Sequence, residues 1–169
     1  MAESSRFVYV TYVRTTPEKL WQALFDPEFT RRYFYETWQE CEWKQGASWR
    51  MMHPDGRALN TGKVLEIEPH RRLVLSWRHE RPPELHEEGF SRCTFELEEK
   101  GSSVKLTIIH ELDKPQSKLI QSVSNGWPLF LASLKSMLET GESLEATRRW
   151  REVQQYFPDR TAGSWPQDL

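Results

Sequence analysis

The sequence predicts an α+β fold in which a curved antiparallel sheet holds one long helix near the C-terminal end of the domain. Two features of the 169-residue chain predict it. Apolar and polar residues alternate along several segments between Trp43 and His110, which is the pattern of strands with one buried face. Apolar residues then recur at helical spacing over residues 125–141. A straight helix cannot touch a strongly curved sheet everywhere, so this arrangement leaves room for a gap between them.

The first elements are a strand and two short helices. Residues 7–14, FVYVTYVR, are rich in β-branched and aromatic side chains and predict a strand. A threonine before Pro17 and Asp26 before Pro27 each place a capping side chain next to a proline, which is typical of a helix start. Two short helices are therefore expected after the first strand.

The middle of the chain predicts an antiparallel meander, for a sheet of about six or seven strands in all. Turn residues such as Pro-Asp-Gly separate the strand-like segments. The segment RPPELHEEG, residues 81–89, is polar and proline-rich, and it predicts a loop. The strand-like segments are residues 47–53, 61–68, 73–80, 91–99 and 103–112.

Helices are predicted for the C-terminal part of the chain. Residues 114–124 predict a short helix that breaks at Asn125-Gly126, and a long helix follows with Pro128 in its first turn. We assign residues 1–141 to one domain and residues 142–169 to a C-terminal extension. The apolar stripe of the long helix contains Trp127, Phe130, Leu131, Leu134, Met137 and Leu138.

The C-terminal extension contains one more periodic segment. Residues 143–157 carry Ala146, Trp150, Val153 and Phe157 at steps of four, three and four, which predicts an amphipathic helix. Such a helix has to bury its stripe, so we expect residues 143–157 to contact the domain, a second copy of the chain or another protein.

Composition excludes several classes of function. The net charge is −2 and acidic residues are interleaved with the basic ones, so nothing indicates nucleic-acid binding. The N-terminus does not resemble a signal peptide, and no apolar run approaches the ~20 residues that span a bilayer. Cys41 and Cys93 fit two free thiols in a reducing compartment, although one bridge between them stays open. The sequence therefore predicts a cytoplasmic protein.

Several stretches resemble one family. They include TTPEKLWQALFDPE, CTFELEEKGSSVKLTIIHE, NGWPLFLASLKSMLETG and the pattern G-x-V-L-E-x-x-P-x-x-R-L-V-x-x-W between Gly62 and Trp77. Together the stretches cover roughly residues 7–141, and they resemble the START-like, Bet v 1-like (SRPBCC) superfamily. Within it the chain is similar to the branch related to the C-terminal domain of the activator of heat-shock-protein-90 ATPase.

The resemblance implies a helix-grip fold, with seven strands around the C-terminal helix and a hydrophobic cavity between them. Relatives bind lipids, sterols, polyketides or other apolar molecules, and some are cyclases or hydratases. The branch supplies no agreed catalytic motif, so no catalytic residue is carried over.

Ten side chains are candidates for contact with a small apolar ligand. Each also suits an ordinary core, where aromatic residues and methionine fill space. His79 and His110 are in phase with the apolar positions, where an imidazole could orient a ligand or simply be hydrogen-bonded. The candidates are Tyr33, Trp49, Met51, Trp77, His79, Phe95, His110, Phe130, Leu134 and Met137.

Three functions remain open from the sequence. The first is binding of a small hydrophobic ligand, with Leu134→Trp tolerated because it fills a cavity. The second is a protein-interaction module such as a chaperone co-regulator, and the third is a small cyclase-like or hydrolase-like enzyme. No cofactor or metal site is expected, since His79 and His86 lie seven residues apart with no HExxH or CxxC motif.

Overall fold

The computed structural model describes residues 3–148 and contains a seven-stranded antiparallel sheet. The strand order is β1-β7-β6-β5-β4-β3-β2, so β1 and β2 are the edges and the expected curved helix-grip sheet is confirmed. The strands are β1 (Ser5–Val13), β2 (Trp38–Cys41), β3 (Ser48–Met52), β4 (Ala58–Glu68), β5 (Arg72–His79), β6 (Ser91–Lys100) and β7 (Ser103–Leu112).

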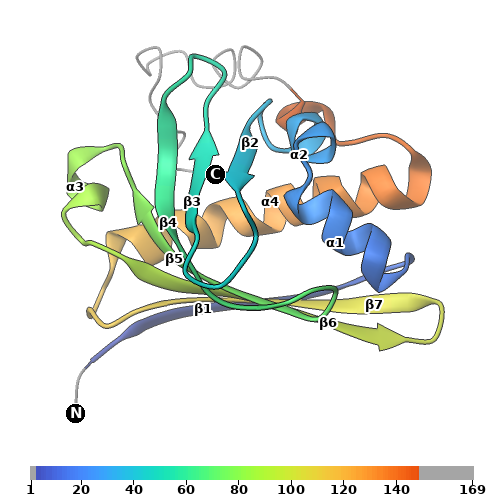
Figure 1. The fold of residues 1–169 in the computed structure, drawn as a ribbon, viewed down its shortest axis with the longest axis horizontal. Coiled ribbons are helices and arrows are strands. Elements are labelled where there is room, and N and C mark those ends of the chain that lie inside the picture. Colours follow the sequence, from blue (N-terminus) through green and yellow to red (C-terminus); the bar gives the residue numbers. More distant parts are fainter. Residues whose placement is uncertain (1–2, 149–169) are drawn as a thin grey trace.

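Helices cover one face of this sheet (Figure 1). The long helix α4 runs across the sheet, and the two predicted short helices, α1 and α2, follow β1. Their caps are those expected: Thr16 Oγ1 accepts from Lys19 N–H (3.3 Å), and Asp26 Oδ1 accepts from Glu28 N–H (2.9 Å). The helices are α1 (Pro17–Phe25), α2 (Pro27–Tyr33), α3 (Pro83–His86), α4 (Lys118–Thr140) and the 3₁₀ turn η1 (Glu145–Thr147).

The predicted break at Asn125-Gly126 is wrong, because α4 is continuous through it. Pro128 lies inside the helix rather than in its first turn, and the helix loses one backbone hydrogen bond there. Buried side chains lie on both sides of Asn125-Gly126, from Leu119 to Met137, and they hold the helix against the sheet. This packing outweighs the low helix propensity of glycine, about 1 kcal/mol relative to alanine.

Two further elements differ from the sequence prediction, and a third is described only at its start. Strand β2 was not predicted because it is only four residues long. The predicted loop at residues 81–89 contains the short helix α3, whose Leu85 is buried. The described start of the segment 143–157 forms the 3₁₀ turn η1, and Trp150, Val153 and Phe157 lie outside the described residues.

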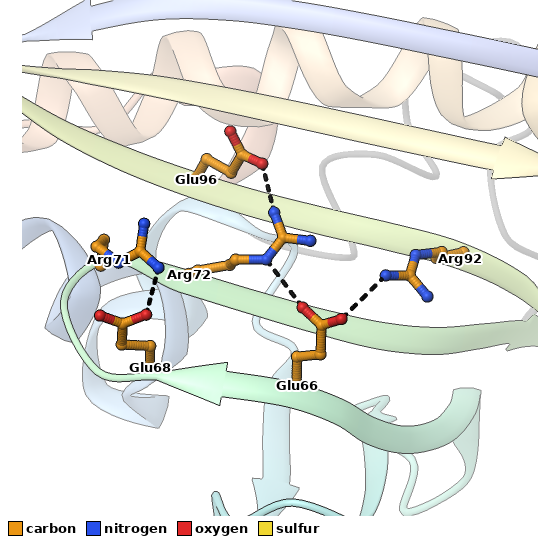
Figure 2. Close-up of polar contacts among 6 residues, drawn as sticks. All are labelled: Glu66, Glu68, Arg71, Arg72, Arg92 and Glu96. Atoms are coloured by element: carbon orange, nitrogen blue, oxygen red, sulfur yellow. Dashed lines mark hydrogen bonds and ion pairs between the residues drawn. The ribbon is translucent and has the colours of Figure 1, made fainter.

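The inner and outer faces of the sheet differ in chemistry. The inner face carries the apolar core beneath α4. On the outer face Glu66 lies between Arg72 (2.9 Å) and Arg92 (3.4 Å), and Arg72 also pairs with Glu96 (Figure 2). Exposed ion pairs of this kind contribute little each. Val74 lies opposite Glu66 in the sheet and is fully buried.

Candidate functional site

The space between the sheet and α4 is almost completely filled. A cavity of about 20 Å³ remains there, which is enough for about one water molecule. Its walls are mostly aromatic and aliphatic side chains from the sheet, α1, α2 and α4. The lining residues are Leu24, Phe25, Tyr33, Phe34, Gln39, Met51, Trp77, Phe95, Trp127, Phe130 and Leu131.

Aromatic rings occupy most of the volume around this cavity. Phe34 stacks on Phe130 with ring centroids 3.7 Å apart, and Tyr35 meets the same ring edge-on at 5.0 Å. Trp127 reaches down from α4 to contact Trp77 and Phe95, both at 5.7 Å. The helix stripe thus meets the sheet through rings rather than across an open space.

Two polar side chains in the cavity wall already have partners. The Gln39 amide donates to the Leu24 carbonyl (2.8 Å) and accepts from Trp49 Nε1 (2.8 Å). The Tyr33 hydroxyl donates to the Ala23 carbonyl (2.8 Å), and burial raises the pKa of Tyr33 far above its usual value. Both groups have hydrogen-bond partners within the protein, so neither requires a polar partner from a ligand. The cavity is therefore chemically apolar.

A buried serine–histidine pair lies next to the aromatic core. Ser91 Oγ is 2.7 Å from His110 Nε2, although Ser91 has no base near it in the sequence. Trp127 Nε1 donates to His110 Nδ1 (3.3 Å), so Nδ1 is the acceptor and Nε2 carries the proton. Ser91 in turn donates to the Trp77 carbonyl (2.9 Å).

This arrangement is opposite to that of a nucleophile and its base. A catalytic imidazole accepts the serine proton, whereas His110 donates to Ser91. Burial lowers the pKa of His110 to about 3, with a further contribution from the charge of His79. The pair is a satisfied core network, and the geometry gives no support to a hydrolase.

His79 is buried at the end of β5, opposite Asn60 of β4. Burial lowers its pKa to about 4, which keeps the ring neutral near pH 7. Its Nδ1 atom is buried and has no hydrogen-bond partner among the described residues. A buried nitrogen without a hydrogen bond lowers the stability of the core, and this cost rises when the ring is protonated.

The ten candidate ligand contacts divide into two groups of five. Tyr33, Met51, Trp77, Phe95 and Phe130 line the cavity. The other five are buried but do not line it, and ligand contact remains a prediction for all ten. The second group is Trp49, His79, His110, Leu134 and Met137.

Six lining residues were not among the candidates. Four of them had a signal in the sequence, because Leu24 and Phe34 belong to the apolar sides of α1 and α2, and Trp127 and Leu131 to the stripe of α4. Gln39 had none, since β2 itself was not predicted. The remaining residue, Phe25, ends α1 and packs edge-on against Phe95 at 5.3 Å.

Leu134→Trp is expected to destabilise the protein, in contrast to the tolerance that the sequence predicted. Leu134 is fully buried and lies away from the remaining cavity, so Leu134→Trp has no empty volume to enter. We expect a loss of about 1–3 kcal/mol in the free energy of unfolding, as for other overpacked cores. Urea denaturation of parent and variant measures it, and an unchanged midpoint would contradict the packed interior.

Open grooves lie on the surface of residues 3–148, and two of them are large. One, of about 860 Å³, is bordered by β2, β3, β4 and Phe90. The other, of about 720 Å³, lies near Arg31, Arg32 and Arg148. Each arginine already has a partner: Arg31 lies over the Trp38 ring, Arg32 donates to the Gly141 carbonyl and Arg148 donates to Ser143.

Within residues 3–148, no three histidine, cysteine, aspartate or glutamate side chains come together as a metal site. Cys41 and Cys93 are free, and burial raises the pKa of the Cys93 thiol well above its usual value. No helix in the described part of the chain is long and apolar enough to cross a bilayer.

Fold and interior together define a helix-grip protein of the START-like, Bet v 1-like (SRPBCC) superfamily. Residues 14–139 match the family described as activator of Hsp90 ATPase homolog 1-like protein. The match covers more than half of the chain, and the chain belongs to this family. Among curated proteins, none matches the sequence.

Solved structures with the same fold come from several bacteria. Protein MLL2253 from Mesorhizobium loti is 23% identical, with a TM-score of 0.68 over 80% of this chain and 97% of its own. CalU16 from Micromonospora echinospora is 21% identical, with a TM-score of 0.65 over 82% of this chain and 78% of its own. The Aha1 dimer from Colwellia psychrerythraea is 18% identical, with a TM-score of 0.65 over 82% of this chain and 99% of its own. At these identities the similarity establishes the fold.

Proposed function

We propose that the chain binds a small apolar molecule between the sheet and α4, at the position of the 20 Å³ cavity. The observation that carries the proposal is the lining of this cavity. Nine of its eleven lining side chains are those of Leu, Phe, Met and Trp residues, and the other two, Tyr33 and Gln39, have their hydrogen bonds within the protein. Such a wall favours apolar ligands and offers no charge for an ionic one.

Binding requires side chains to move, because the cavity holds only about one water molecule. The segment between α2 and β2 is suited to this movement. It places Phe34 in the cavity wall, and the next two residues, Tyr35 and Glu36, have φ angles of 52° and 61°. Left-handed backbone at non-glycine residues is unfavourable. A rearrangement that moves Tyr35 and Glu36 out of this conformation therefore recovers part of the free energy needed to open the cavity.

The test compares two substitutions one helical turn apart on α4. Leu131 lines the cavity, whereas Leu134 is buried outside it. Phenylalanine at either position overpacks the core and costs about 1–3 kcal/mol. Only Leu131→Phe occupies the proposed site, so only it should abolish saturable binding of the neutral fluorescent probe N-phenyl-1-naphthylamine. Leu134→Phe is the matched control and should retain binding.

Fluorescence titration at a temperature where all three proteins are folded gives the result. The proposal fails if the parent shows no saturable binding, or if Leu131→Phe binds as well as the parent. Equal loss in both variants would also count against this position of the site, because it would reflect general destabilisation.

A further inference from the structure

The two edges of the sheet are protected to very different degrees. An uncovered edge strand exposes unpaired backbone N–H and C=O groups, and proteins usually blunt it by shortness, proline, bulges or charges. Strand β2 is only four residues long and packs beside α2. Strand β1 is nine residues long, contains no proline or glycine, and pairs with β7 in one unbroken register from Ser5 to Val13.

The free side of β1 has almost no partner among residues 3–148. Lys135 Nζ, from α4, donates to the Tyr12 carbonyl. This carbonyl therefore points to the free side of β1, away from β7. Because backbone polar groups alternate along a strand, those of Val8 and Val10 point the same way. No backbone hydrogen bond from outside the sheet reaches Val8 or Val10 in the described residues.

The outer face of the same strand is apolar. Val8, Val10 and Tyr12 are 48%, 44% and 51% exposed, and Ile109 of β7 lies beside Val8. The rest of the outer face is different, because over β4, β5 and β6 it is covered by the ion pairs of Glu66, Arg72 and their neighbours (Figure 2). Of the six exposed large apolar side chains in the described residues, three therefore lie in one row on β1, whereas Leu65, Phe90 and Leu144 lie on other segments.

The sequence of β1 has a similar pattern of apolar and polar residues in both directions from Val10. Reading outward from this residue gives Tyr9 and Thr11, then Val8 and Tyr12, then Phe7 and Val13, then Arg6 and Arg14. An antiparallel pair of identical strands centred on Val10 places Val10 opposite Val10, Val8 opposite Tyr12 and Phe7 opposite Val13, while Tyr9 lies opposite Thr11. A two-fold axis makes such an interface with one patch used twice.

The charges at the ends of the strand are compatible with this pairing. Arg6 would face Arg14 of the second copy, but each arginine has an acidic neighbour in its own chain. Arg6 Nε lies 3.7 Å from Glu111, and Arg14 interacts with the carboxylate of Glu139. The Tyr12 carbonyl has a second lone pair, so its bond to Lys135 does not prevent a strand-to-strand hydrogen bond.

We infer that β1 is the docking edge for a second copy of this chain, joined antiparallel across a two-fold axis at Val10 to extend the sheet through the dimer. This places the interface on the edge strand instead of residues 143–157, where the sequence indicated one. The edge strand has no strand on its free side among residues 3–148, carries an exposed apolar row, and places most of its apolar residues opposite apolar residues when paired with itself about Val10. These three features together favour a copy of β1 over an unrelated peptide.

The first experiment measures mass in solution by sedimentation equilibrium over a wide concentration range. The full-length parent should dimerise, and Val10→Arg should be monomeric because it sets two like charges at the axis. Leu65→Arg is the matched control: Leu65 is 37% exposed on β4, away from β1, and should leave the dimer intact. A monomeric parent, or a Val10→Arg variant that still dimerises, overturns the proposal.

The second experiment reports the register of the strands. In a Cys41→Ala background, Val10→Cys should form an intermolecular disulfide on mild oxidation, since the Cα atoms of such a pair lie ~5.5 Å apart. Val8→Cys should not, because the two copies of residue 8 would be about 14 Å apart. Equal crosslinking of both variants, or of neither, contradicts an axis at Val10. A dimer lost on removal of residues 149–169 but kept in Val10→Arg would place the interface in the C-terminal segment instead.

Discussion

Gly62→Ala is expected to destabilise the protein by about 3 kcal/mol. A Cβ atom at this position would lie 1.7 Å from the carbonyl oxygen of Ser76 and 2.6 Å from its carbonyl carbon. Both are backbone atoms of the neighbouring strand β5, so no side chain can rotate away to make room. Strand β4 would have to separate from β5 next to the register shift between Val64 and Glu66.

Gly56→Ala is the matched control for this substitution. Gly56 lies in the turn before β4 with φ at 87°, and a Cβ atom there meets nothing within 4 Å. It carries only the cost of left-handed backbone, about 1–2 kcal/mol. Urea unfolding of the three proteins should rank the parent first, Gly56→Ala second and Gly62→Ala last. Equal stability of the two variants would show that β4 and β5 can move apart.

The second large effect is a loss of stability in mild acid, caused by His79 and His110. Their folded pKa values, about 4 and about 3, lie below the ordinary value of 6.5. The unfolded chain therefore takes up these protons first as the pH falls. The stabilising contribution is complete above pH 6.5 and is lost as the pH falls toward the folded values. At about pH 4 the linkage amounts to roughly 3 kcal/mol for each histidine.

His79→Leu separates this effect from the titration of the carboxylates. The leucine removes a proton-binding group whose Nδ1 has no partner in the described residues, so stability near pH 7 should change little. Near pH 4 the variant should be more stable than the parent by about 3 kcal/mol. Chemical denaturation at both pH values measures the difference, and His86→Leu, on an exposed side chain, should show no such gain. A variant that loses stability in acid as steeply as the parent would contradict burial of a neutral His79.

Much of the fold follows from local signals in the sequence. The caps Thr16 and Asp26 start α1 and α2 where they were expected, since the cap and the following proline act within one turn. The alternating pattern placed five strands of the meander and the inner faces of four of them. The pattern between Gly62 and Trp77 resembles the family and is specific in the length and order of its residues.

The residues that line the candidate site were harder to predict from the sequence than the fold. Periodicity shows that Phe130, Leu131 and Leu134 face inward, but not which of them borders a cavity. Phe34 and Gln39 come to the cavity from α2 and β2 across large separations in the chain. The contact of Ser91 with His110 also joins two strands, and its proton arrangement depends on Trp127 from α4.

By itself, the sequence determined the α+β class and the inward faces of the strands and helices, because these depend on spacing along the chain. The family came from the resemblance of several stretches to known relatives. Tertiary structure alone decided that α4 runs unbroken through Gly126 and that rings of three elements fill the interior to a cavity of about 20 Å³. It also decided that β1 is an edge strand, with no further strand beside it among residues 3–148. These features depend on which side chains meet across the sheet and on the volume they occupy together, and periodicity within one segment does not report either quantity.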